Sequence, residues 1–166
     1  MIQVGDRIPD ATLFESTEMG EFCPVSPGKV SVAEAIKGKK IVIFGLPGAY
    51  TPTCSAKHVP GYLANLDAMK AKGVDEVWCV SVNDGYVMAK WGMDEKAFGK
   101  IRFLGDGSAE FAKKLGLEQD LNSAGMGMRM KRSSLLVDDG VVKAVNVEQP
   151  GKFEVSNAET MLKQLA

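Results

Sequence analysis

The feature that most constrains the fold is the compact apolar run over residues 41–46, which two lysines precede and Pro47-Gly48 follows. A run of this length, bounded by charge and by turn residues, is typical of a buried central strand. Similar runs over residues 77–82 and 101–104 predict two further strands. Strands of this kind need helices or a second layer to cover them, so the run predicts a sheet at the centre of the molecule.

The segments between and after these strands have apolar residues at the spacing of a helix. Apolar residues recur at that spacing over residues 55–73, where Pro60 is expected to bend the helix without ending it. Asp139-Gly140 between two strand-like runs predicts a β-hairpin. We therefore expect one mixed α/β sheet covered by helices, in a single domain over residues 1–166. The remaining expected elements are helices near 86–91 and 108–115, the latter closed by Gly116, and two helices opened by the capping boxes Ser31/Glu34 and Ser156/Glu159.

The bulk composition excludes several classes of protein. The 166 residues are 45% apolar and 25% charged, which is ordinary for one globular domain. The 20 basic and 21 acidic side chains nearly cancel, so no net field recruits nucleic acid or an anionic membrane. No apolar run approaches the roughly 20 residues of a membrane helix. The first residues lack the regions of a secretory signal, so we expect a cytoplasmic protein.

The three cysteines, Cys23, Cys54 and Cys79, form an odd number without a C-x-x-C pair. This pattern argues against a disulfide-stapled secreted scaffold and against a four-cysteine zinc site. Reduced thiols in a cytosol-like compartment fit better. Each cysteine is then either packing or chemistry, and its surroundings decide which.

Cys54 has the surroundings of a reactive thiol. A thiol attacks only as thiolate, and Cys54 lies where the loop after the 41–46 strand enters a helix, whose first turn favours negative charge. Thr51 can place a hydroxyl near both the sulfur and a bound oxygen, and Pro47 and Pro52 stiffen the loop. Residue types alone leave open a strand-to-helix connection whose cysteine only packs.

The wider segment resembles a known family. Pro47-x-x-x-Thr51-x-x-Cys54 is the signature of the peroxiredoxins, and the run over residues 47–62 is similar to their peroxiredoxin-5, or type II, branch. The similarity continues through residues 81–84, 87–91, 103–107 and 129–134, and so covers nearly the whole chain. It implies a thioredoxin-like fold with N-terminal additions to the central mixed sheet.

The resemblance also implies roles for individual residues. Cys54 corresponds to the peroxidatic cysteine, Thr51 to the hydroxyl that orients the peroxide, and Pro47 to the shield over the pocket. Arg129 is the expected cation beside the thiolate, with Arg132 as the second candidate, and a solvated face remains the alternative for a cluster of basic residues.

The implied reaction is reduction of hydrogen peroxide or an alkyl hydroperoxide by the Cys54 sulfur, which becomes a sulfenic acid. No metal or organic cofactor is expected. The family suggests a homodimer, and the implied reductants are glutathione with glutaredoxin, or thioredoxin.

A second cysteine that would reduce the Cys54 sulfenic acid is missing from its expected place. In part of this branch a cysteine near the C-terminus reduces the sulfenic acid, and here Val155 stands about there. An external thiol is therefore expected. Cys79 follows Cys54 by 25 positions, as in the glutathione and glutaredoxin-dependent members, yet its apolar strand predicts a packing residue, and Cys23 matches no motif of the family.

Several alternatives stay open at this point. His58, the only histidine, could pair with Cys54 on a metal, although a structural or electrostatic role near the thiol fits better. Trp91 and Phe44 could line the pocket or belong to the core. A disulfide reductase lacks its cysteine pair, and a cysteine phosphatase lacks its arginine, because Pro60 stands about six residues after Cys54. A redox sensor or chaperone that uses Cys54 oxidation as a signal is the main alternative to a peroxidase.

Overall fold

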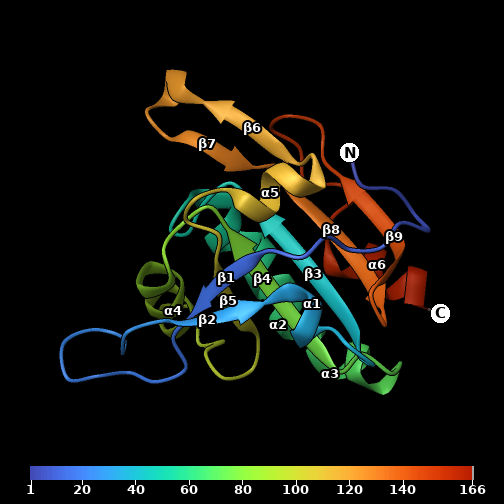
Figure 1. Cartoon of the computed structure of the whole chain (residues 1–166), viewed down its shortest axis with the longest axis horizontal. Coiled ribbons are helices and arrows are strands. Elements are labelled where there is room, and N and C mark those ends of the chain that lie inside the picture. Colours follow the sequence, from blue (N-terminus) through green and yellow to red (C-terminus); the bar gives the residue numbers. More distant parts are fainter. Residues whose placement is uncertain (166) are drawn as a thin grey trace.

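A seven-stranded mixed sheet forms the centre of the protein, as predicted (Figure 1). The computed structural model describes residues 1–165. The central strand, β3 (Lys40–Leu46), pairs in parallel with β4 (Glu76–Ser81) and antiparallel with β8 (Ser133–Asp138). The strand order is β2-β1-β5-β4-β3-β8-β9. The other strands of this sheet are β1 (Thr12–Glu15), β2 (Gly28–Ser31), β5 (Arg102–Gly105) and β9 (Val141–Val147).

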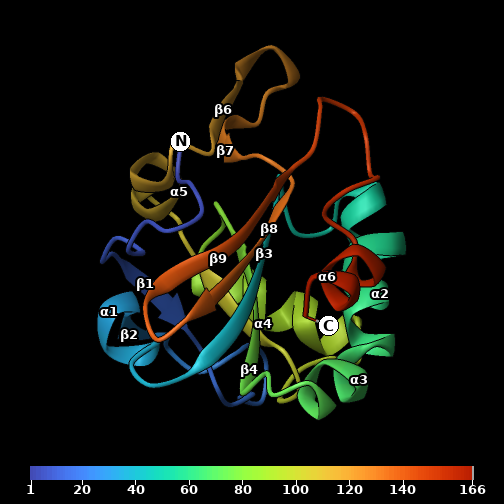
Figure 2. The same ribbon diagram turned by 90° about the vertical axis from the view of Figure 1, so that its right-hand side faces the viewer.

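Alternate residues of β3 enter two separate cores, one on each face of the sheet. Phe44 and its β3 neighbours of the same parity pack in one core, and Ile43 packs in the other. Figure 2 shows helices on both sides of the sheet. One face is covered by α2 (Val59–Ala64), α3 (Leu66–Ala71), α4 (Gly85–Asp94) and α6 (Ala158–Leu165), and the other by α1 (Val32–Ala35) and α5 (Glu110–Leu115).

The predicted hairpin is confirmed in β8 and β9, which pair antiparallel around Asp139-Gly140. Both turn residues have positive φ, 46° at Asp139 and 84° at Gly140, which a two-residue turn between twisted strands requires. The predicted helices near 86–91 and 108–115 are α4 and α5, and Gly116 ends α5 with φ 70°. Pro60 does not end its helix, and the break between α2 and α3 lies at Asn65.

One predicted cap is wrong. Ser156 was expected to cap the last helix, but its hydroxyl donates to the Glu148 carboxylate, and the Thr160 N–H is accepted by Asn157 instead. The helix begins at Ala158, so Asn157 and not Ser156 is the residue that can accept from the N–H groups of its first turn. The other predicted cap is present, since Ser31 accepts from the Glu34 N–H at 3.4 Å.

A small two-stranded sheet projects beside the main one (Figure 1). It consists of β6 (Glu118–Leu121) and β7 (Gly127–Met130), joined by the single 3-10 turn Asn122–Ala124. These four-residue strands lack a buried face with strict alternation, which is why the sequence pattern did not indicate them. Among residues 1–165, no helix has the length and apolarity needed to cross a membrane.

Candidate active site

Cys54 lies at the carboxyl end of β3, in the first helical turns after the Pro47 loop. Its side chain is fully buried. The five residues Cys54–His58 form a π-helical turn, in which the Val59 N–H donates to the Cys54 carbonyl. Such widened turns are frequent at functional sites, and here the turn carries both Cys54 and His58.

The cation at the thiol is Arg132. Its Nη2 donates to the Cys54 Sγ at 3.1 Å. Arg132 directly precedes β8, whose first residue, Ser133, is paired with Gly45 near the end of β3. The register of β8 against β3 therefore places Arg132 beside the carboxyl end of β3, where the loop to Cys54 begins.

The structure does not place Arg129, the first candidate for this role, at the sulfur. Arg129 lies in β7, and its Nε and Nη1 donate to the carbonyls of Met126 (2.8 Å) and Pro47 (3.1 Å). A Cβ added to Gly48 would lie 2.8 Å from Arg129 Nη1, so a side chain at this position would displace the guanidinium. Arg129 thus holds the loop before Cys54 through the Pro47 carbonyl. It lies away from the sulfur because its strand, β7, pairs with β6 and not with the central sheet.

Thr51 closes the same loop from within. Its hydroxyl donates to the Gly48 carbonyl at 2.7 Å, and its own carbonyl accepts from the Ser55 N–H at 3.0 Å. With its proton committed to Gly48, the Thr51 oxygen can only accept a hydrogen bond from a ligand.

His58 lies behind Arg132, one helical turn beyond Cys54, and is fully buried. Its Nδ1 faces Arg132 Nη1 at 3.0 Å, and its Nε2 faces the Ser156 carbonyl at 3.1 Å. Burial, followed by the charge of Arg132, lowers the pKa of His58 to about 3. The ring is therefore neutral at physiological pH. No group of three or more metal-ligating side chains exists in the described part of the chain. The contact of His58 Nδ1 is with the guanidinium of Arg132.

The two aromatic residues considered for the pocket wall lie in the core beneath the site. Phe44 stacks on Tyr62 with centroids 4.2 Å apart and also contacts the His58 ring. Trp91 is almost completely buried, and its Nε1 donates to the Ser55 hydroxyl at 3.0 Å. Both residues hold the helix that carries Cys54 against the sheet.

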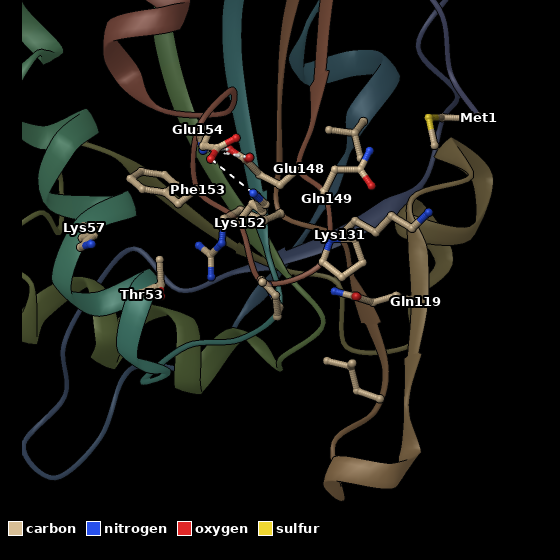
Figure 3. Close-up of a pocket in the computed structure, with 16 residues that line it drawn as sticks. Met1, Thr53, Lys57, Gln119, Lys131, Glu148, Gln149, Lys152, Phe153 and Glu154 are labelled. Carbon is tan, nitrogen blue, oxygen red and sulfur yellow. Dashed lines mark hydrogen bonds and ion pairs between the residues drawn. The ribbon is translucent and has the colours of Figure 1, made fainter.

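A cleft of about 990 Å³ opens next to the thiol, with Arg132, Pro47 and Thr53 in its wall. Figure 3 shows Lys57 and Thr53 on one side, Lys131 and Gln119 on the other, and the segment from Glu148 to Glu154 between them. Cations outnumber carboxylates in this wall. The cations are Lys57, Lys131, Arg132 and Lys152, and the carboxylates are Glu148 and Glu154.

Known proteins resemble this chain over nearly its whole length. A family model described as Redoxin matches residues 3–162. Peroxiredoxin-2B of Arabidopsis thaliana is 45% identical over 164 residues, which are 99% of this chain and 98% of that protein. This chain belongs to the Redoxin family and is a peroxiredoxin.

Solved peroxiredoxin structures match in three dimensions as well. Reduced Prx3 of Vibrio vulnificus, in complex with hydrogen peroxide, superposes with a TM-score of 0.91 at 46% identity, covering 100% of both chains. Peroxiredoxin 5 of Alvinella pompejana does so with a TM-score of 0.85 at 30% identity, covering 99% of this chain and 98% of that one. The predicted thioredoxin-like fold is confirmed, and the chain is a peroxidase enzyme.

The other two cysteines of this peroxiredoxin differ in their surroundings. Cys79 is fully buried in β4, as predicted, and burial followed by the nearby Cys54 raises the pKa of its thiol well above the usual range. Cys23 is exposed in the loop between β1 and β2. Val155 is 40% exposed, and its N–H donates to Glu148. A thiol with a raised pKa is a poor nucleophile, so Cys79 is unsuited to attack a sulfenic acid.

Proposed function

We propose that this peroxiredoxin reduces hydrogen peroxide and alkyl hydroperoxides through Cys54 and is recycled by a thiol from another molecule. The observation that carries the proposal is the 3.1 Å hydrogen bond from Arg132 to the Cys54 sulfur. A fixed guanidinium favours the thiolate and also stabilises charge that develops on peroxide oxygens. The complex of the similar Vibrio vulnificus Prx3 with hydrogen peroxide supports the choice of substrate.

In the proposed reaction the Cys54 thiolate attacks the terminal oxygen of the peroxide. An S–O bond forms, the O–O bond breaks, and the leaving oxygen takes a proton and departs as water or an alcohol. The sulfur is oxidised to a sulfenic acid and the peroxide is reduced. Thr51 accepts a hydrogen bond from the protonated peroxide oxygen, Arg132 stabilises the negative charge, and Pro47 keeps water from the thiolate.

Return to the thiol uses two equivalents of an external thiol. The first displaces water from the sulfenic acid and forms a mixed disulfide, and the second releases the Cys54 thiol together with a disulfide of the reductant. We favour glutathione with glutaredoxin over thioredoxin. The cleft beside Cys54 supports this choice, since its size suits a small ligand and its excess of cations suits a carboxylate-bearing thiol.

We further propose a homodimer in a reducing, cytoplasmic compartment. Tyr50, in the loop before Cys54, and Tyr86 and Met93, on α4, expose 52%, 44% and 41% of their surfaces. Exposed aromatic and apolar side chains of this kind are typical of interfaces. The three free thiols suit a reducing compartment.

Peroxide consumption by the wild type and by Cys54→Ser tests the proposal. One assay supplies glutathione and glutaredoxin, and the other supplies thioredoxin and its reductase. We expect turnover that depends on Cys54 and is faster in the first assay. Turnover in neither assay would contradict the peroxidase proposal and favour a redox sensor.

Intact mass after one equivalent of peroxide, in the presence of a sulfenic acid trap, tests the site separately. The adduct is expected on Cys54. An adduct on Cys79 or Cys23 instead would overturn the assignment of the reactive thiol.

A further inference from the structure

A continuous chain of hydrogen bonds joins the Cys54 sulfur to the segment that precedes α6. Arg132 uses Nη2 for the sulfur at 3.1 Å and Nη1 for His58 Nδ1 at 3.0 Å. The other ring nitrogen of His58 meets the Ser156 carbonyl at 3.1 Å. Ser156 is held in turn by Glu148, whose Oε2 accepts from both its N–H and its hydroxyl at 2.7 Å.

The partners of His58 determine its tautomer. The Ser156 carbonyl can only accept, so the proton must be on Nε2, and Nδ1 then has a free lone pair. Arg132 can only donate, which matches that lone pair. A doubly protonated ring would set an N–H against the guanidinium. The burial that keeps the ring neutral, with a pKa of about 3, therefore also keeps it an acceptor.

The chain explains how a long and flexible arginine is held in one orientation. Among residues 1–165, the side-chain hydrogen bonds of Arg132 go to Cys54 and His58 alone. Its guanidinium also lies over the Phe153 ring, 5.9 Å from the centroid, and its carbonyl accepts from the Glu148 N–H at 2.9 Å. Without His58, one half of the guanidinium would lose its acceptor and the side chain would regain rotamer freedom.

Glu148 stabilises the far end of the chain. Burial acts to raise the pKa of Glu148, but hydrogen bonds from Glu154, Ser156 and Val155 outweigh it and leave the pKa below its ordinary value. The carboxylate stays charged and keeps the 154–156 backbone in place. The Ser156 carbonyl is thus a rigid acceptor, and the Tyr62 hydroxyl also donates to it at 2.9 Å.

We propose that His58 is a positioning residue, which holds Arg132 on the Cys54 sulfur by accepting its hydrogen bond at Nδ1 in the tautomer that Ser156 selects. The inference rests on the proposed function only in taking Cys54 as the thiol that attacks peroxide. It assigns no contact of His58 with substrate.

Two substitutions of His58 each keep one of its two side-chain hydrogen bonds and remove the other. In His58→Asn the side-chain oxygen falls near the place of Nδ1 and can accept from Arg132, while the bond to Ser156 is lost. In His58→Gln the amide reaches the place of Nε2 and can donate to Ser156, while the acceptor for Arg132 is lost. Both are made in a Cys23→Ser background, which removes the exposed thiol, and the mass of the labelled peptide shows that the alkylated cysteine is Cys54.

The main readout is the rate of Cys54 alkylation by iodoacetamide at neutral pH, with the thermal midpoint of each variant measured alongside. We expect His58→Gln to slow alkylation about tenfold, the usual weight of a hydrogen bond to a charged group, and His58→Asn to restore most of that rate. Equal rates in the two variants, or rates that follow the thermal midpoints, would overturn the inference. Alkylation needs neither peroxide nor reductant, so this pattern can hold even if peroxide turnover fails.

A second measurement needs no variant. His58 is the only histidine, so the nitrogen NMR spectrum of the labelled imidazole reports on it alone. We expect the neutral tautomer protonated at Nε2 from pH 5 to pH 8. A ring protonated at Nδ1 in that range would contradict the inference even where His58→Gln fails to fold.

Discussion

Arg132 donates to the Cys54 sulfur, although 78 positions separate the two residues in the chain. The pairing of β8 with β3 closes that separation, because Arg132 directly precedes the strand that runs antiparallel to β3. Arg129, only three positions earlier, lies in the small β6–β7 sheet and contacts the Pro47 carbonyl instead. The two arginines therefore have different tasks.

The first prediction separates these tasks. Arg132→Met removes the cation from the thiol, and we expect kcat/KM for hydrogen peroxide to fall about 100-fold or more. Arg129→Met removes one hydrogen bond to the Pro47 carbonyl and one to the Met126 carbonyl, and we expect mainly a loss of about 1–2 kcal/mol in the free energy of unfolding. Peroxide kinetics and urea unfolding of both variants test this, and a larger kinetic loss in Arg129→Met would reverse the assignment.

A second prediction concerns the hydroxyl of Thr51. Thr51→Val keeps the shape of the side chain but removes its bond to the Gly48 carbonyl and its acceptor for peroxide. We expect kcat/KM for peroxide to fall about 100-fold, as for other lost positioning groups, while Thr51→Ser retains most of it. The comparison uses initial rates at low peroxide, and equal rates for the two variants would show that the hydroxyl is dispensable.

The third prediction is a pH dependence of stability. Folding lowers the pKa of His58 from 6.5 to about 3, so the unfolded chain binds a proton that the folded protein does not. The stability that His58 contributes is complete above pH 6.5 and declines as the pH falls toward 3. We expect a loss of about 2 kcal/mol in the free energy of unfolding between pH 8 and pH 5.

His58→Asn is the control for that experiment. The asparagine side chain does not titrate between pH 5 and pH 8, and the charged neighbours Arg132 and Glu148 are retained. Urea unfolding at pH 8 and pH 5 should show a smaller loss in the variant than in the wild type. The same loss in both proteins would mean that another group causes the pH dependence.

A fourth prediction tests the cleft as the entrance for an anionic thiol. Lys57 and Lys131 line it and take part in none of the salt bridges found among residues 1–165. In the double variant Lys57→Gln/Lys131→Gln, we expect the reaction of the Cys54 sulfenic acid with glutathione to slow about 2- to 5-fold, as exposed charges allow. Reaction with uncharged 2-mercaptoethanol should be unchanged.

The matched control for the cleft is Lys143→Gln, which removes an exposed charge from β9 outside the cleft wall. It should react with both thiols as the wild type does. Raising the salt concentration should reduce the difference between wild type and double variant with glutathione, since salt screens exposed charges. A double variant that slows both thiols equally would point to a disturbed loop instead of lost attraction.

Local patterns in the sequence predicted much of the fold and the place of Cys54 at the start of a helix. The apolar run at 41–46, the turn at Asp139-Gly140 and the spacing from Pro47 to Cys54 each depend on neighbours in the chain, and each is present in the structure. The capping box at Ser156 failed for a reason outside its own segment, because Glu148 binds both the N–H and the hydroxyl of Ser156 and the helix begins only after Asn157. The short strands β6 and β7 have too few residues for a pattern.

By itself, the sequence determined the mixed sheet, the position of Cys54 at a helix start and the absence of a second cysteine at Val155. Only the tertiary structure decided which arginine contacts the sulfur and which groups His58 contacts. Those contacts depend on the register of β8 against β3 and on the fold of the segment from Glu148 to Ser156. Spacing along the chain carries no information about register, and two arginines three positions apart can therefore face different partners.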